Sequence, residues 1–239
     1  MPDTRPPFQA LLFDFDGTLS RLTIDFARLR RKITALAEPF LGEEPEQSDA
    51  PVLEWLDELA EEIRGFDEAL GLEFHTRGRL VIQATELDAA REAELFPFTR
   101  PLLASLRASG VKTGILTRNS TAAVKVVFPD ILACCDAFMA REDAPKIKPD
   151  PAHALALLAR LGVAPGRALL VGDHPLDIEA ARRAGLFAAA VESGHASREA
   201  LAAAQPDYLA KDCAALMDLL QECFALPFST GRAIWPASR

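Results

Sequence analysis

Short apolar runs bounded by polar or turn-forming residues predict buried β-strands in this chain. The first run, residues 10–13, is followed at once by the polar segment Asp14-Phe15-Asp16-Gly17-Thr18. Further runs lie at 111–116, 168–171 and 187–191, and segments with helical periodicity separate these three. Strands that alternate with helices at this spacing are typical of a parallel sheet with helices on both faces. We therefore expect an α/β fold whose ligand-binding loops follow the carboxyl ends of the strands.

The pattern changes between residues 23 and 98. Apolar residues recur at helical spacing from Phe26 to Phe40 and again from Val52 to Leu70, and the charged stretch 42–51 with its prolines separates the two runs as an exposed loop. This pattern predicts an all-helical insertion after the first strand. Trp55 and three phenylalanines are expected to pack its core, namely Phe26, Phe40 and Phe66. The alternative is that a few of them face the active-site cleft.

These patterns divide the chain into three parts. We assign residues 1–22 and 99–226 to the sheet-containing core and 23–98 to the helical insertion. Residues 227–239 are expected to form a loosely docked C-terminal tail.

Several residues mark the ends of the expected helices. Asp150 before Pro151 is typical of an N-cap with a first-turn proline, and Gly162 after Leu161 is typical of a C-terminal cap. The other expected stops are Gly110 and Gly185, and the other expected starts are Ser120 or Thr121, Ser197 and Asp212.

Composition and charge narrow the possible partners. The 239 residues contain 26 Lys and Arg against 35 Asp and Glu, which gives a formal net charge of −9. Nucleic acid or an anionic membrane would be repelled, so neither is expected as a partner.

The chain has no apolar run near the roughly 20 residues that a membrane-spanning helix needs, and its start does not resemble a secretory signal. Its four cysteines lack the paired spacing of a zinc or redox site, so we expect a cytoplasmic protein.

Polar side chains capable of chemistry occur in four short segments. Loops that follow parallel strands converge on one edge of the sheet, so residues far apart in sequence can form one site. The four segments contribute Asp14, Asp16 and Thr18; then Thr117, Arg118 and Asn119; then Lys148; and last Asp173 and Asp177.

The charges in these segments favour phosphoryl transfer. Crowding several carboxylates strongly disfavours ionising all of them unless cations intervene, and Mg²⁺ accepts carboxylate ligands while keeping water or substrate oxygens. Lys148 supplies a second, compact positive charge. Thr117 offers a hydroxyl, and the backbone N–H groups of Arg118 and Asn119 at the start of a helix are candidate anion donors. Phosphoryl transfer depends mainly on positioning and on neutralising oxygens, which these groups can provide.

The four segments, in this order, resemble the motifs of the haloacid dehalogenase-like hydrolase superfamily, in the branch that includes phosphoglycolate phosphatase and β-phosphoglucomutase. The motifs are Asp14–Leu19, Thr117, Lys148–Pro151 and Gly172–Asp177, and the match spans most of residues 8–223. The resemblance implies a Rossmann-like parallel-sheet core with an inserted all-helical cap domain that covers the site.

The resemblance also implies roles for individual residues. Asp14 would attack phosphorus and form an aspartyl-phosphate, while Asp16 would protonate the leaving oxygen and then activate water. Thr117 and Lys148, with Arg118 and Asn119, would hold the phosphoryl group. Mg²⁺ would be bound by Asp14, the backbone carbonyl of Asp16 and Asp173, with support from Asp177.

The expected protein is a Mg²⁺-dependent phosphatase acting on a small phosphorylated metabolite, either phosphoglycolate-like or a sugar phosphate, as a monomer or homodimer. Haloacid dehalogenases lack the second aspartate of the first motif, which is Asp16 here, so the resemblance disfavours carbon–halogen cleavage. A phosphomutase of the same fold is one alternative, and a binding module without turnover is another. The residues Ser20-Arg21-Leu22-Thr23 depart from the acidic and hydroxyl pair common near phosphoglycolate phosphatase, which leaves the subfamily open.

Basic side chains outside the motifs have two interpretations. His75, Arg77 and Arg79 form a basic group inside the acidic insertion. They either belong to a solvated turn, or Arg77 or Arg79 grips an anionic group of the substrate. Arg21, close in sequence to Asp14, is a similar candidate for substrate specificity.

Lys146 and Lys148 compete for one role. Lys148 precedes Pro149, which favours an extended backbone at the entrance to the next helix, so we expect Lys148 at the site and Lys146 in solvent. His174 lacks a second histidine at ligand spacing and is interpreted as a loop residue. The Cys134-Cys135 pair is interpreted as apolar packing.

Overall fold

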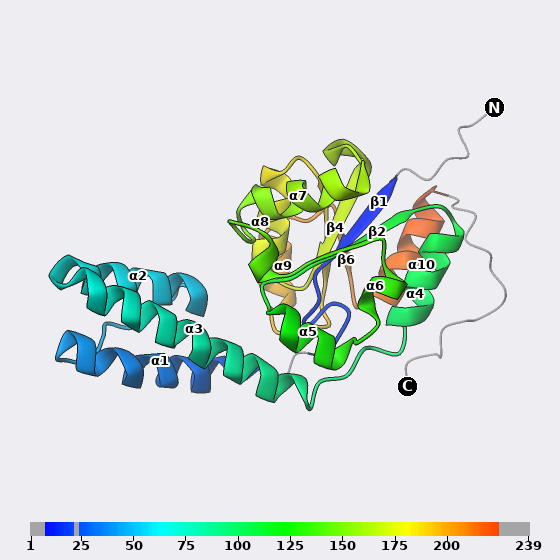
Figure 1. The fold of residues 1–239 in the computed structure, drawn as a ribbon. Helices are drawn as coiled ribbons and strands as arrows, with labels where there is room; N and C mark the ends of the chain where they lie inside the picture. Colours follow the sequence, from blue (N-terminus) through cyan, green and yellow to red (C-terminus); the bar gives the residue numbers. More distant parts are fainter. Residues whose placement is uncertain (1–7, 22–23, 225–239) are drawn as a thin grey trace. The chain divides into compact units, whose positions relative to one another are not determined.

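The computed structural model describes residues 8–21 and 24–224 (Figure 1). The chain divides into a sheet unit, Met1–Leu22 with Ala93–Arg239, and a helical unit, Thr23–Glu92. Residues 93–98, which the sequence pattern assigns to the insertion, thus belong to the sheet unit. The reason is local pairing, since the Phe96 N–H donates to the Leu19 carbonyl at 3.0 Å and Leu95 forms a β-bridge with Ser20. The predicted tail, 227–239, lies outside the described residues.

The sheet unit contains a six-stranded parallel sheet in the order β3-β2-β1-β4-β5-β6, which confirms the predicted fold class. Two of its strands were missed from sequence, because three residues are too few to show a period of two. The strands are β1 (Ala10–Phe13), β2 (Lys112–Leu116), β3 (Ala137–Met139), β4 (Ala168–Gly172), β5 (Phe187–Val191) and β6 (Tyr208–Ala210).

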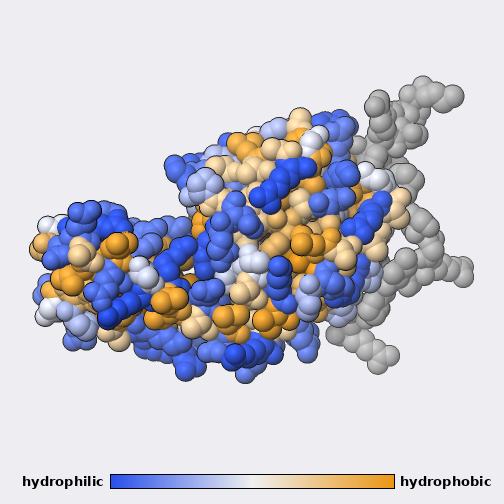
Figure 2. All heavy atoms as spheres, in the orientation of Figure 1, coloured by the Kyte–Doolittle hydropathy of each residue, from blue (hydrophilic) through white to orange (hydrophobic). Residues whose placement is uncertain are grey.

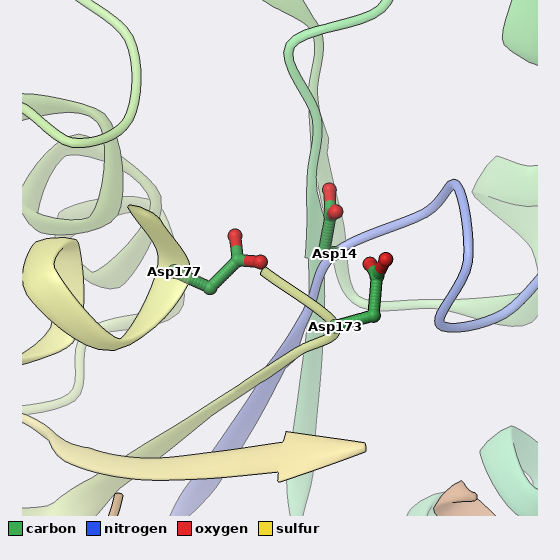
Figure 3. Close-up of side chains that lie close together, drawn as sticks. All are labelled: Asp14, Asp173 and Asp177. Carbon is green, nitrogen blue, oxygen red and sulfur yellow. The ribbon is translucent and has the colours of Figure 1, made fainter. Parts of the chain in front are cut away.

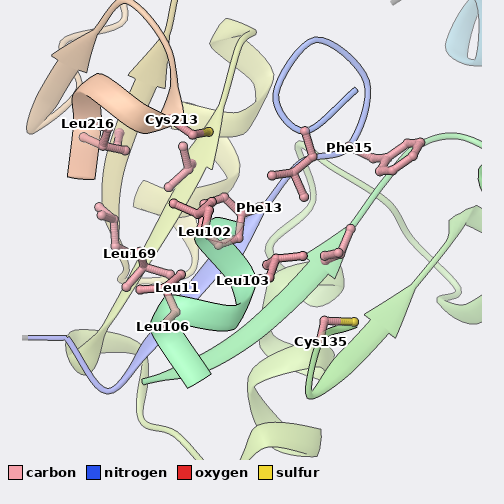
Figure 4. Close-up of a cluster of buried hydrophobic side chains, with 14 of the residues drawn as sticks. Leu11, Phe13, Phe15, Leu102, Leu103, Leu106, Cys135, Leu169, Cys213 and Leu216 are labelled. Carbon is pink, nitrogen blue, oxygen red and sulfur yellow. The ribbon is translucent and has the colours of Figure 1, made fainter. Parts of the chain in front are cut away.

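Side chains that alternate along β1 enter two separate cores. Leu11 and Phe13 pack on one face with residues of α4 (Thr99–Ala108) and α10 (Cys213–Phe224), as Figure 4 shows. Ala10 and Leu12 pack on the other face with residues of α7 (Pro151–Leu161) and α8 (Pro175–Arg183). Because both faces are covered, β1 is apolar throughout and forms the centre of the sheet unit.

The predicted helix ends in the sheet unit are confirmed. Asp150 accepts a hydrogen bond from the Ala152 N–H, and Gly162 has the left-handed conformation that ends α7. Gly110 and Gly185 also have positive φ, while Ser120, Ser197 and Asp212 cap the helices that follow them. The shorter helical segments are α5 (Thr121–Val127), α6 (Ile131–Cys134), η1 (Arg141–Asp143), η2 (Pro165–Arg167) and α9 (Arg198–Ala203).

The helical unit consists of α1 (Phe26–Leu41), α2 (Val52–Phe66) and α3 (Glu68–Ala90). The predicted loop between its first two helices is confirmed. The periodic run from Val52 to Leu70, however, is not one helix. Asp67 has an extended backbone and caps α3 by accepting from the Ala69 and Leu70 N–H groups. Because the chain turns there, Phe66 is 78% exposed, and Phe26 at the start of α1 is 45% exposed, so the predicted place of both in the core was wrong.

Close contacts between α2 and α3 hold the helical unit together. A Cβ on Gly78 would lie 2.2 Å from a methyl carbon of the buried Leu56, so a larger residue there would force Leu56 to move. Phe40 packs edge-on against Phe74, and Trp55 is buried under the Arg30 guanidinium.

On the face seen in Figure 2, exposed apolar side chains are interspersed with charged ones.

Two further predictions concern packing and membranes. Cys135 is buried in the core of the sheet unit, as expected, and burial raises the pKa of its thiol to about 12. Within the described ranges, no helix combines the length and apolar character needed to cross a membrane.

A buried histidine in α7 couples stability to pH. His153 is fully buried, and neither ring nitrogen has a hydrogen-bond partner among the described residues. Burial lowers the pKa of His153 from 6.5 to about 4, and the positive charge of Lys148 acts in the same direction. Between these two pH values the unfolded chain binds a proton that the folded chain does not, so the free energy of unfolding falls as the pH falls.

We expect replacement of His153 by methionine to remove this dependence. The wild type should lose about 2 kcal/mol of unfolding free energy more than His153→Met between about pH 7 and about pH 5. Urea unfolding at the two pH values measures the difference. Equal losses in both proteins would show that His153 does not carry the effect.

Candidate functional site

The site forms where the strand order reverses. β2 and β3 lie on one side of β1, and β4, β5 and β6 lie on the other. Asp14 directly follows β1 and Asp173 directly follows β4, and the Asp14 N–H donates to the Val171 carbonyl at 2.8 Å. In open parallel sheets, ligands bind at the carboxyl ends of strands at such a reversal.

A tight turn after β1 brings Thr18 back to the site. The Phe15 carbonyl accepts hydrogen bonds from the Thr18, Leu19 and Ser20 N–H groups, and Gly17 has a φ of 79°. A Cβ on Gly17 would lie 2.4 Å from the Asp173 carboxylate, so the turn requires glycine both for conformation and for space. The Thr18 hydroxyl donates to Asp173 Oδ1 at 3.2 Å.

Lys148 places a buried ammonium between two carboxylates. Its Nζ lies 2.6 Å from Asp14 Oδ1 and 2.6 Å from Asp177 Oδ1, and its side chain is 1% exposed. The Arg118 guanidinium donates to the backbone carbonyl of Lys148 and so fixes this loop. Lys146 instead lies at the surface, 3.6 Å from Asp150. The structure therefore brings Lys148, and not Lys146, to the carboxylates.

Three aspartates form an acidic cluster (Figure 3). Carboxylate oxygens of Asp14, Asp173 and Asp177 lie within 4.8 Å of one another. They come from the ends of β1 and β4 and from the first turn of α8. Gly172 leaves the space for Asp177, since a Cβ at position 172 would lie 2.2 Å from the Asp177 carboxyl carbon.

This cluster is short of positive charge. Burial raises the pKa of Asp14 to about 6, although Lys148 acts in the opposite direction. Burial and the charges of Asp14 and Asp177 raise the pKa of Asp173 well above its usual value. Burial alone would lower the pKa of Lys148, but its two carboxylate partners raise it, so the ammonium stays charged.

The donor set fits a divalent cation with a preference for oxygen. Carboxylates with raised pKa values would ionise more readily beside Mg²⁺, and their oxygens are the ligands it prefers. Asp14 and Asp173 are the principal candidates. Asp177 already accepts hydrogen bonds at both oxygens, from Lys148 and from the His174 N–H. Its carboxylate therefore orients Lys148 as well as adding negative charge.

The loop after β2 supplies the remaining predicted residues. Thr117 is buried, and its hydroxyl oxygen accepts a hydrogen bond from the Asn119 N–H at 3.0 Å. The Asn119 side-chain amide donates to Asp16 Oδ2 at 2.9 Å. The Asp16 side chain thus contacts Asn119, and it is not part of the three-aspartate cluster.

Residues after β5 belong to the site but were missed from sequence. The Ser193 hydroxyl donates to the Gly17 carbonyl at 2.6 Å, and a Cβ on Gly194 would lie 1.7 Å from Asp173 Oδ2. The signal was present, because residues 187–191 were predicted as a strand and loops at strand ends were expected to carry the site. Glu192 directly follows the strand, but the two residues that reach the site, Ser193 and Gly194, carry no charge and so did not stand out in the sequence.

Gly194 leads to a prediction about metal binding. A methyl group at this position would displace the Asp173 carboxylate, so Gly194→Ala should weaken Mg²⁺ binding by about 10-fold or more. Calorimetric titration with Mg²⁺ measures the affinity directly. Gly166→Ala is the matched control, because a Cβ there meets nothing within 4 Å. Equal affinities for Gly194→Ala and the control would contradict the prediction.

The predicted specificity residues lie in different surroundings. Arg21 is exposed, and its backbone N–H donates to the Glu94 carbonyl. Arg77 pairs with Glu73 and lies over the Phe40 ring. Arg77 and Arg79 both belong to the middle of α3, so the proposed solvated turn was wrong. A helix continues through this region because α2 packs along it.

His75 and His174 also have defined partners. His75 Nε2 lies 2.9 Å from Asp57 Oδ1 of α2. His174 precedes α8, and its ring nitrogen Nδ1 accepts a hydrogen bond from the Leu176 N–H at 3.2 Å. His174 therefore caps a helix.

The fold and its site define the class of the protein as an α/β enzyme with its chemistry at the carboxyl edge of a parallel sheet. A model of the haloacid dehalogenase-like hydrolase family matches residues 8–185. The chain belongs to this family, as the order of its motifs predicted.

Known relatives carry phosphatase names. Phosphoglycolate phosphatase of Synechococcus elongatus is 32% identical over 205 residues, which cover 84% of this chain and 92% of that protein. A Clostridium perfringens protein provisionally named pyrophosphatase PpaX is 29% identical over 216 residues, covering 90% of this chain and 98% of that protein. These relatives and the family confirm the prediction of an enzyme that hydrolyses phosphoric monoesters.

A solved structure supports the fold independently. The crystal structure of a predicted phosphoglycolate phosphatase from Haemophilus somnus matches with a TM-score of 0.63 at 23% identity, covering 90% of this chain and 99% of that chain. At this identity the match shows a shared fold.

Proposed function

We propose that the protein is a Mg²⁺-dependent phosphatase that hydrolyses a small phosphorylated metabolite through an aspartyl-phosphate on Asp14. One observation carries the proposal: the Asp14 carboxylate is held by the buried Lys148 ammonium beside Asp173, at the carboxyl end of the central strand. The named relatives favour phosphoglycolate or a similar small phosphate ester as the substrate.

The first chemical step uses both aspartates of the first motif. An Asp14 carboxylate oxygen attacks phosphorus and forms a new P–O bond, while the bond between phosphorus and the ester oxygen breaks. Asp16 gives its proton to that leaving oxygen, so an alcohol departs. Lys148 restrains Asp14 and offsets negative charge near the phosphoryl oxygens. Thr117 and the backbone N–H of Arg118 are the candidate phosphate-binding groups, because the Asn119 N–H already donates to the Thr117 hydroxyl oxygen.

The second step returns the enzyme to its starting state. Asp16, now ionised, takes a proton from a water molecule as that water attacks phosphorus. The P–O bond to Asp14 breaks, which releases inorganic phosphate and restores the Asp14 carboxylate. When bound by Asp14 and Asp173, Mg²⁺ would supply Lewis-acid charge for the phosphoryl oxygens.

We assign substrate selection to the helical unit, in the role that the family resemblance gives to a cap. Arg77 and Arg79 are its candidate anion-binding residues, and Arg21 is the candidate in the sheet unit. An arginine at any of these positions would favour a substrate with a carboxylate or second phosphate.

A substrate screen tests the proposed function. We expect Mg²⁺-dependent phosphate release from at least one small ester in a panel of phosphoglycolate, sugar phosphates, pyrophosphate and 4-nitrophenyl phosphate. EDTA should stop the release, and excess Mg²⁺ should restore it. Isomer formation without phosphate release would indicate a phosphomutase instead. Undiminished hydrolysis in EDTA, or none with any substrate, would refute the proposal.

A further inference from the structure

Hydrogen bonds hold both the backbone and the side chain of Asn119. Its side chain is buried, and its backbone N–H donates to the Thr117 hydroxyl oxygen at 3.0 Å. Its backbone carbonyl accepts from the Arg141 N–H at 3.1 Å. The side-chain oxygen Oδ1 accepts from the Ser120 N–H at 2.7 Å, and this bond sets which end of the amide is the oxygen. The amide is therefore held in a single orientation.

With Oδ1 occupied in this way, the amide nitrogen faces the first motif. Nδ2 donates to Asp16 Oδ2 at 2.9 Å, across 103 residues of sequence. We propose that Asn119 is a positioning residue that holds the Asp16 carboxyl for proton transfer. This inference rests on the proposed function, because it assigns Asp16 the proton given to the leaving oxygen and taken back from water.

The hydrogen bond has a specific chemical consequence. A carboxyl oxygen that already accepts an amide hydrogen is a poorer site for a proton than the other oxygen of the same carboxyl group. Asn119 therefore directs the transferable proton to Oδ1 of Asp16. It also limits rotation of the carboxyl group, so the proton donor is in place before the P–O bond breaks. Proton transfer by a positioned side chain contributes about 10²- to 10⁴-fold to rate, and part of that depends on correct position.

The role differs from the direct phosphate binding expected from sequence. A residue that binds phosphate acts on every phosphate ester alike. A residue that acts through Asp16 matters only where the leaving oxygen needs a proton. Alkyl phosphates need it, because an alkoxide leaves poorly. The phenolate of 4-nitrophenyl phosphate leaves without it.

The test compares kcat/KM for the two kinds of ester, since kcat/KM reports the steps through the first P–O cleavage. In the full-length enzyme with saturating Mg²⁺, Asn119→Ala should lose about 30-fold or more with the best alkyl phosphate. The loss with 4-nitrophenyl phosphate should be below about 3-fold. Inhibition by inorganic phosphate should be nearly unchanged.

Asn119→Asp is a variant of matched shape that replaces the amide donor with an oxygen. It should show the same dependence on leaving group, and it keeps the test valid if the alanine variant folds poorly. In an Asp16→Ala background, adding Asn119→Ala should cost little more with the alkyl ester, because the two residues act together. Equal losses for both esters, or fully additive losses, would overturn the inference. Failure of the wild type to hydrolyse any ester would instead refute the proposed function, and the inference with it.

Discussion

Replacing Asp14 with asparagine is expected to abolish turnover while the fold is retained. The amide cannot form an acyl phosphate, so kcat/KM should fall by about 10⁴-fold or more with every substrate. The fold should tolerate the change, because the substitution removes one of three crowded carboxylates and keeps its shape. Phosphate release with the best ester of the screen measures the loss.

A second measurement isolates the covalent step. After acid quenching, mass spectrometry of the wild type should detect a phosphate adduct on the peptide that contains Asp14, and the variant should lack it. Asp88→Asn is the matched control, because Asp88 is an exposed carboxylate of α3 that pairs with Arg91, the residue directly after this helix. Activity in Asp14→Asn similar to that control would exclude the mechanism.

Replacing Lys148 with methionine should destabilise the protein as well as inactivate it. Lys148 is the buried cation between Asp14 and Asp177, and without it two close carboxylates face each other. Removing one partner of a buried charge network costs about 3–5 kcal/mol. The loss should be smaller at low pH, because Asp14, whose pKa is already raised to about 6, then takes up a proton.

Urea unfolding in EDTA measures this effect without stabilisation by metal. Lys146→Met is the matched control, since Lys146 is an exposed lysine of the same loop that pairs with Asp150. It should change the unfolding free energy by less than about 0.5 kcal/mol. A loss in Lys148→Met no larger than that of the control would contradict the view that Lys148 compensates buried charge.

Patterns within single elements predicted much of the fold. The apolar runs at 10–13 and 187–191 are strands, and Asp150 and Gly162 begin and end α7 as expected. Such features depend on a few neighbouring residues, so they can be recognised without knowing what packs against them.

Errors arose where a pattern lacked tertiary context. The helical spacing of 52–70 continues through Asp67, although the chain turns there and Asp67 caps the next helix. The strands 137–139 and 208–210 are too short for their alternation to be seen, and they form because a parallel neighbour offers backbone partners.

The sequence by itself determined the class of chemistry, since the order and types of the motif residues indicate paired aspartates, an anion-binding loop, a lysine and an acidic cluster. Only the tertiary structure decided how these groups meet. It places Lys148 between Asp14 and Asp177, Asn119 against Asp16, and Gly194 against Asp173. The physical reason is that residues far apart in the chain are brought together by strand order and register, which depend on the packing of the whole sheet rather than on any one segment.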